Sequence, residues 1–155
     1  MSADPVLHIA LMNPEIGPNA GNIGRLCLGI GARLHLIHPL GFQTDDKAVR
    51  RAGLDYWKHV DVVEHQSSEA FWAWAHGRSV YPFTTKSKDS YAQITFARGD
   101  ILLFGPESRG LAESVLSQRG GWTIPMTGPI RSLNLSNAVA VVAYAALQQL
   151  EGDLF

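Results

Sequence analysis

Length, composition and charge narrow the class of protein at once. The chain has 155 residues, of which 46% are hydrophobic and 17% charged, and its formal net charge is −1. These values predict one globular domain over residues 1–155, exclude a disordered chain and argue against indiscriminate nucleic-acid binding. The single cysteine excludes an internal disulfide framework. No apolar run approaches the roughly 20 residues that span a bilayer, and the N-terminus lacks the features of a signal peptide, so we expect a cytoplasmic protein without a membrane partner.

Patterns typical of strands and of helices alternate along the chain. Apolar runs predict strands at 6–12, 33–38, 59–63, 79–83, 100–104 and 122–124. Helices are predicted at 23–30 with Gly31 as C-cap, at 44–52, from a Ser67 cap to Gly77, at 110–118 and at 138–147. This alternation predicts an α/β fold, a mostly parallel sheet flanked by helices on both faces. Ligands of such sheets bind beyond the carboxyl ends of the strands.

Three polar, glycine-bearing segments leave the carboxyl ends of predicted strands, at 13–25, 105–110 and 128–137. In the first of them, Asn19, Asn22 and Arg25 are spaced by three residues, which puts them on one face of a helix that begins near Asn19. The guanidinium of arginine is suited to phosphate or carboxylate. The alternative is that the asparagines cap the helix and that Arg25 is a solvated charge.

The second segment has the sequence FGPESRG after a predicted strand. Gly105 lets a ligand approach the backbone, Pro106 stiffens the turn, and Glu107 is able to accept hydrogen bonds from hydroxyl or amine donors. The alternative is an ordinary strand-to-helix turn in which Glu107 lies near the helix N-terminus. Neither the spacing of a Walker loop nor that of a G-x-G-x-x-G fingerprint occurs here.

The third segment places four small polar residues around two leucines, just before an apolar helix: Ser132, Leu133, Asn134, Leu135, Ser136 and Asn137. Capping a helix requires only one such residue. We therefore weigh a ligand loop, whose backbone and amide groups surround a small polar molecule, against an N-cap with redundant polar residues.

A basic segment lies between the first two loops. Lys47, Arg50 and Arg51 fall at i, i+3 and i+4, so that all three project from one side of the predicted helix. Such a cluster is suited to phosphate contacts that position an RNA without reading its bases. A solvated helix face is the alternative interpretation.

Other reactive side chains offer weaker candidates. The six histidines have no metal-ligand spacing, and we expect no metal; His8 and His35 lie in predicted strands and should be packed. Cys27 lies among apolar residues and indicates a core position. The aromatic segment 71–74 is typical of a core or an interface. Ser132 has no histidine beside it, which disfavours a Ser–His hydrolase.

Four segments together carry a resemblance to a known family. They read PEIGPNAGNIGRLC (14–27), DDKAVRRAGLDYWKH (45–59), LLFGPESRGL (102–111) and IPM…RSLNLSNAVAVVAY (124–144). In this order they resemble the SPOUT superfamily of S-adenosylmethionine-dependent RNA methyltransferases, and within it the tRNA wobble-nucleotide 2′-O-methyltransferases of the TrmL (YibK) branch. One departure is the MTGPIR approach to Ser132, which leaves SLNLSNA intact.

The resemblance implies a fold, a reaction and partners that the residue pattern alone does not. The fold would be a SPOUT α/β-knot with a deep trefoil knot at its C-terminal end. The protein would be a homodimer in which both subunits contribute to each site. Its reaction would methylate the ribose 2′-hydroxyl of the wobble nucleotide, cytidine 34 or a modified uridine 34, in the anticodon stem-loop of tRNA, with leucine tRNAs as expected substrates. A non-catalytic RNA-binding module and a methyltransferase for another tRNA or ribosomal RNA site remain alternatives.

The same resemblance assigns roles to residues. The S-adenosylmethionine contacts would be Phe83, Thr84, Gly105, Glu107, Gly110, Ile124, Met126, Ser132, Leu133 and Asn134. Arg25 would activate the hydroxyl, Asn19 and Glu107 would shape its pocket, and Ser132 and Asn134 would hold Arg25 and the ribose. Because a guanidinium has a pKa above about 12, it is a poor general base. We therefore predict that Arg25 binds the adjacent phosphate and stabilises the forming alkoxide, while a phosphate oxygen or water takes the proton.

Overall fold

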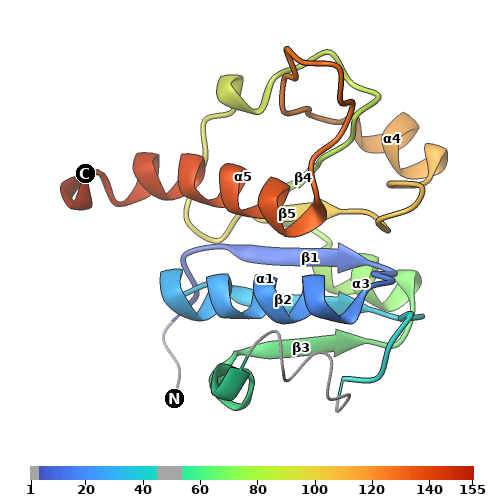
Figure 1. Cartoon of the computed structure of the whole chain (residues 1–155), viewed down its shortest axis with the longest axis vertical. Helices are drawn as coiled ribbons and strands as arrows, with labels where there is room; N and C mark the ends of the chain where they lie inside the picture. Colours follow the sequence, from blue (N-terminus) through green and yellow to red (C-terminus); the bar gives the residue numbers. More distant parts are fainter. Residues whose placement is uncertain (1–3, 45–53) are drawn as a thin grey trace.

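The computed structural model describes residues 4–44 and 54–155, which form an α/β fold around one parallel sheet (Figure 1). Its five strands are β1 (His8–Met12), β2 (Arg33–Ile37), β3 (Val62–His65), β4 (Val80–Pro82) and β5 (Ile101–Phe104). They lie in the order β3-β2-β1-β5-β4, and every pairing is parallel. The prediction of a parallel α/β sheet is confirmed.

Helices cover both faces of the sheet, as predicted. They are α1 (Gly17–Ile30), α3 (Ser68–Ala75), α4 (Glu113–Arg119) and α5 (Leu135–Leu150), with 3₁₀ turns at Leu54–His59, Tyr91–Gln93 and Gly152–Leu154. Side chains of a strand alternate between the faces. Ile9 of β1 therefore joins the core under α1 and α5, and Ala10 joins the core that contains Phe71 of α3. Figure 1 shows α1 and α5 running across the same face of the sheet.

The first helix is longer than the sequence predicted, since α1 begins at Gly17 and not near residue 23. Pro18 stands in the first turn, where a missing N–H costs nothing because that group has no helical partner. Gly24 serves packing, because a Cβ there would lie 2.7 Å from Cζ3 of Trp57. The prediction of an irregular loop as far as residue 22 was wrong, because Pro18 fits the first turn of a helix.

Other boundaries shift by a few residues. The final helix begins at Leu135, so Ser136 and Asn137 belong to its first turn and not to the loop. The predicted helix at 110–118 begins only at Glu113, because Gly110 has a left-handed φ of +71°. The predicted strand 59–63 lies at Val62–His65.

The predicted strand 122–124 consists of two isolated bridges, Phe83 with Trp122 and Ser90 with Thr123. The predicted helix 44–52 falls, apart from residue 44, outside the described residues. Three local predictions are confirmed: Ser67 caps α3, Gly31 ends α1 with φ +76°, and Cys27 is buried. The trefoil knot stays a prediction. No helix in residues 4–44 and 54–155 is long and apolar enough to cross a membrane.

Three histidines form a hydrogen-bonded row across neighbouring strands. His8 Nδ1 lies 2.8 Å from His35 Nε2, and His35 Nδ1 lies 2.9 Å from His65 Nε2. The Trp74 ring packs against all three imidazoles. Burial lowers the pKa of His8 to about 4 and that of His35 to about 2, and it also lowers the pKa of His65. The packing predicted for His8 and His35 is confirmed, whereas nothing in the sequence spacing indicated the row.

This row predicts that acid destabilises the protein well above the titration range of ordinary carboxylates. Below pH 6.5 the unfolded histidines take up protons that the folded ones do not. The free energy of unfolding should therefore be fully present above pH 6.5 and fall towards pH 4, by about 1.4 kcal/mol per pH unit for each such histidine. Urea unfolding at several pH values measures this slope. It should be shallower in His35→Asn and unchanged in the exposed-site control His76→Asn; a flat profile between pH 6.5 and 5 would contradict the prediction.

Candidate active site

A cavity of about 530 Å³ opens beyond the carboxyl ends of β1, β4 and β5. Its walls come from the start of α1, residues 83–86, residues 104–110, residues 122–126 and residues 131–135. β1 leads into α1 on one face of the sheet, whereas β5 leads towards α4 on the other. The loops after these two neighbouring strands therefore diverge, which is the place where α/β sheets bind ligands.

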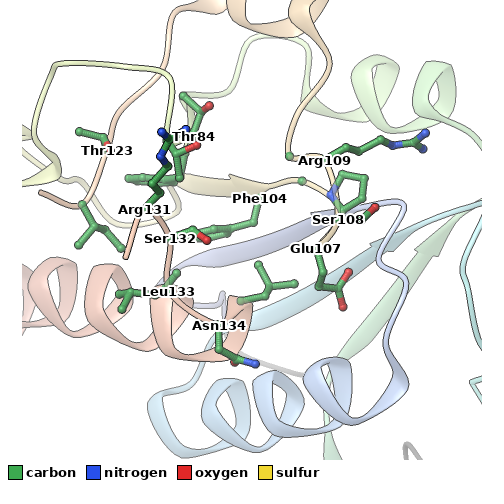
Figure 2. Close-up of a pocket in the computed structure, with 18 of the residues that line it drawn as sticks. Thr84, Phe104, Glu107, Ser108, Arg109, Thr123, Arg131, Ser132, Leu133 and Asn134 are labelled. Carbon is green, nitrogen blue, oxygen red and sulfur yellow. The ribbon is translucent and has the colours of Figure 1, made fainter. Parts of the chain in front are cut away.

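The cavity brings together every residue predicted to contact the cofactor. Lining it are Phe83, Thr84, Gly105, Glu107, Gly110, Ile124, Met126, Ser132, Leu133 and Asn134, together with Asn19. Figure 2 shows Ser132, Leu133 and Asn134 on the approach to α5, and Glu107 and Ser108 on the loop after β5. The two loops face each other across the opening, so the predicted groups share one site.

The loop after β5 turns back so sharply that only glycine fits at its start. A Cβ on Gly105 would lie 2.3 Å from the backbone nitrogen of Leu111 and 2.4 Å from the carbonyl carbon of Gly110. The turn is closed by the Gly110 N–H, which donates to the carbonyl of Pro106 at 2.8 Å. Gly105 and Gly110 both line the cavity, so this turn brings backbone groups to its edge.

Glu107 ties this loop to the start of α1. Its Oε1 accepts from the Glu15 N–H at 2.8 Å, and its Oε2 accepts from the Ile16 N–H at 2.9 Å and from Asn19 Nδ2 at 3.1 Å. These donors stand at the N-terminus of α1, where backbone N–H groups lack helical partners. Glu107 thus accepts hydrogen bonds from the start of α1, which is distant in sequence, and not from α4, the next helix along the chain.

At the opposite wall of the cavity, the Asn134 side chain caps α5 and also bonds to α1. Its Oδ1 accepts from the N–H of Ser136 at 2.9 Å and from the Ser136 hydroxyl at 2.6 Å, which caps α5. Its Nδ2 donates to Asn19 Oδ1 at 3.2 Å. The capping interpretation therefore holds for Asn134, while the adjacent Ser132 and Leu133 line the cavity.

A second carboxylate completes the link between the loops. Glu15 accepts from the Ser108 N–H at 2.8 Å and from the Ser108 hydroxyl at 2.9 Å. These bonds hold the pKa of the Glu15 carboxyl below its usual value. Glu15 and Glu107 thus each accept from the other's loop. The sequence carried no signal for this pairing, because its partners lie about ninety positions apart.

Arg25 lies apart from the other predicted catalytic residues. Asn19 is buried, whereas Asn22 and Arg25 are exposed. In a helix of 3.6 residues per turn, the six-residue step from Asn19 to Arg25 ends on a different side. The Arg25 guanidinium lies 5.0 Å from the centroid of the Tyr56 ring and does not line the cavity. The expected shared face of these three residues is therefore wrong.

The predicted RNA contacts Lys47, Arg50 and Arg51 lie outside the described residues. Cations that the sequence did not assign nevertheless line the cavity, namely Lys86, Arg109 and Arg131. Arg131 directly precedes Ser132, and that adjacency was the only signal that could have identified it. Within the described ranges, no group of three His, Cys, Asp or Glu side chains is placed to hold a metal ion.

Comparisons with known proteins agree with this geometry. The chain matches the SpoU rRNA Methylase family over residues 6–144. Over 148 residues it is 46% identical to a tRNA (cytidine(34)-2′-O)-methyltransferase of Escherichia coli (strain K12), with 94% of each chain covered. It is 48% identical to the protein of that name from Aeromonas hydrophila, with 94% of this chain and 95% of the relative covered.

A solved structure gives the same assignment. That structure concerns the 2-OH methylation of C/U34 on tRNA. It superposes on this chain with a TM-score of 0.92 at 48% sequence identity. The match covers 97% of this chain and 99% of that chain. Sequence and architecture both agree along nearly the full length, which confirms the resemblance carried by the motifs: the chain belongs to the SpoU rRNA methylase family.

Proposed function

We propose that this protein is an S-adenosylmethionine-dependent methyltransferase that acts on the ribose 2′-hydroxyl of the wobble nucleotide, cytidine 34 or a modified uridine 34, in tRNA. The observation that carries the proposal is the cavity, which all three motif-bearing loops line together. Relatives named as tRNA (cytidine(34)-2′-O)-methyltransferases match 94% of the chain and therefore include these loops. Leucine tRNAs are the expected substrates.

The residues of the cavity fit an adenosyl cofactor. Its volume of about 530 Å³ lies within the range of small-molecule sites. The stacked rings of Phe83 and Phe104, with Ile124 and Leu133, give it apolar walls, and the glycine turn brings backbone groups to its edge. When bound, S-adenosylmethionine supplies an electrophilic methyl group. The chain holds it through the loop after β5 and the approach to α5, and in this way aligns it with the hydroxyl.

The position of Arg25 supports a site shared between two subunits. Arg25 is exposed on α1 three residues before Leu28, which is 39% exposed. The neighbouring α5 exposes Val141 (37%) and Tyr144 (47%). Apolar side chains on the outer faces of two packed helices are typical of an interface between subunits. We propose a homodimer in which this surface is covered and each Arg25 enters the cavity of the partner subunit.

In this arrangement each group has a chemical role. The guanidinium of Arg25 binds the phosphate next to the target ribose and stabilises the forming alkoxide, while a phosphate oxygen or water takes the proton. Ser132 and Asn134 orient the ribose and Arg25. Asn19 and Glu107 position the site and do not touch the substrate. Asn19 donates to Glu107 and accepts from Asn134, so these bonds hold the start of α1 against the loop after β5 and the start of α5.

The proposal includes the remaining expectations from the sequence. The bridges from Phe83 to Trp122 and from Ser90 to Thr123 tie the segment after β4 to the segment before α5. This tie supports a C-terminal trefoil knot within a single domain of residues 1–155. Lys47, Arg50 and Arg51 are proposed to contact tRNA phosphates. A tRNA-modifying enzyme of this kind works in the cytoplasm.

Methyl transfer from labelled S-adenosylmethionine to defined RNAs tests the function. Purified protein is incubated with leucine tRNA or with ribosomal RNA, and the digested products are mapped by mass spectrometry. We expect one 2′-O-methyl group on nucleotide 34 of the tRNA. Label at another tRNA position or in ribosomal RNA, which the family description makes the second candidate, would reject the wobble assignment. Calorimetry without any heat on cofactor addition would indicate a non-catalytic RNA-binding module.

A further inference from the structure

The lysines and arginines of residues 4–44 and 54–155 differ in the partners of their charged groups. Three of them pair with carboxylates: Arg33 with Asp61, Lys86 with Glu113, and Arg98 with Glu151. Three more lie over aromatic rings: Arg25 over Tyr56, Arg78 over Trp74, and Arg119 over Trp72. Four have no such partner within these ranges: Lys58, Lys88, Arg109 and Arg131. Of these four, Arg109 and Arg131 line the cavity.

Arg109 and Arg131 reach the cavity from different loops. Arg109 belongs to the turn after β5, and Arg131 precedes the cap of α5. Both side chains are exposed, and in Figure 2 they lie on two sides of the opening, with Arg109 extending outwards. Hydrogen bonds from Ser108, helped by the charge of Arg109, lower the pKa of the Glu15 carboxyl. Because the hydrogen bonds of Glu15 go to Ser108, the Arg109 guanidinium keeps its donors available.

We infer that Arg109 and Arg131 bind backbone phosphates of the RNA on either side of the nucleotide whose ribose enters the cavity, an inference that rests on the proposed function. A guanidinium matches a phosphate through two parallel hydrogen bonds. Phosphate contacts fix the register of a nucleic acid, and the single-stranded loops that proteins recognise in RNA expose their phosphates. A chain with a formal charge of −1 depends on such local cations to bind a polyanion.

Another anion competes for these arginines, because S-adenosylmethionine carries a carboxylate. Measurements on the two ligands separate the possibilities. Arg109→Gln and Arg131→Gln each remove one positive charge without adding bulk. Arg98→Gln is the matched control, since it removes the same charge before β5, at the strand end opposite the cavity. Affinity for a tRNA anticodon stem-loop is measured across a salt titration, and affinity for S-adenosylmethionine is measured by calorimetry.

Each cavity variant is expected to weaken RNA binding about tenfold and to leave cofactor affinity unchanged. Each should also flatten the logarithmic salt dependence of RNA binding by about 0.7, the slope of one lost phosphate contact on a single strand. The control should move neither quantity by a comparable amount. Arg131→Lys, which keeps the charge, should recover the salt slope and only part of the affinity.

The contrary outcomes are distinct. RNA affinities equal to that of Arg98→Gln would overturn the inference while leaving methylation by the wild-type protein intact. Weakened cofactor binding with unchanged RNA binding would assign the arginines to the cofactor carboxylate and overturn it as well. A wild-type protein that neither binds the stem-loop nor methylates tRNA would reject the proposed function together with this inference.

Discussion

Mixing an Arg25→Ala protein with a Ser132→Ala protein is expected to restore methyltransferase activity that neither protein has alone. Ser132 lines the cavity, whereas Arg25 lies outside the cavity of its own chain. If each site combines Arg25 of one subunit with Ser132 of the other, a mixed dimer contains one site with both residues intact. Random exchange of subunits makes half of the dimers mixed, so recovery should reach about a quarter of wild-type activity.

A matched pair of variants controls this experiment. Ser132 and Asn134 line the same cavity of one chain. Mixing Ser132→Ala with Asn134→Ala therefore leaves every cavity defective, and no activity should return. Recovery of activity in both mixtures would show that it does not come from complementary subunits, and the first mixture would then not support a shared site. Failure of the first mixture to recover, or full activity in a protein shown by sedimentation to be monomeric, would reject the shared site.

A Gly105→Ala protein is expected to lose affinity for S-adenosylmethionine by about a hundredfold or more. The added Cβ would lie within 2.9 Å of the Gly110 carbonyl oxygen, and closer still to two other backbone atoms of residues 110 and 111. Backbone cannot rotate away as a side chain can, so the turn at the edge of the cavity has to open. Overpacking of this kind costs about 1–3 kcal/mol of stability, and the displaced loop also loses its contacts with the ligand.

Calorimetric titration with S-adenosylmethionine and thermal unfolding together test this prediction. Gly152→Ala is the control, because a Cβ there meets no atom within 4 Å. It should bind the cofactor as the wild-type protein does. Wild-type affinity in a folded Gly105→Ala protein would show that the turn does not hold the ligand. If Gly105→Ala is unfolded at room temperature, Gly121→Ala takes its place in the test. Its Cβ would lie 2.7 Å from the Thr84 side chain, which lines the same cavity.

The parallel sheet and the three loops that line the cavity could be predicted because their signals are local. Apolar runs such as DILLF predict strands without reference to a partner, and alternation with helices implies parallel pairing. Caps such as Ser67 and Gly31 depend only on the residues of one turn. All ten predicted cofactor contacts meet in one cavity because the motifs follow strands whose carboxyl ends share an edge. The motif match, and not the periodicity, identified the family.

Element boundaries failed where a residue serves a distant partner. Pro18 is typical of a loop when only its neighbours are considered, yet it lies in the first turn of α1. The reason is tertiary, since the Glu107 carboxylate, on the loop after β5, accepts hydrogen bonds from the Glu15 and Ile16 N–H groups at the start of α1. The predicted strand at 122–124 failed for a related reason: its backbone finds only isolated bridges to Phe83 and Ser90.

The sequence by itself determined which side chains stand at the carboxyl edge of the sheet, because strand order along the chain and loop composition are local properties. Tertiary structure decided which of these side chains meet. Strand register made His8 and His35 diagonal neighbours on β1 and β2, where their imidazoles meet. Helix phase turned Arg25 away from Asn19, and loop folding paired Glu15 with Ser108. The hydrogen bonds among these groups join residues 27 to 93 positions apart. A local pattern states what a group can bind, whereas only the folded chain brings its partner within hydrogen-bonding distance.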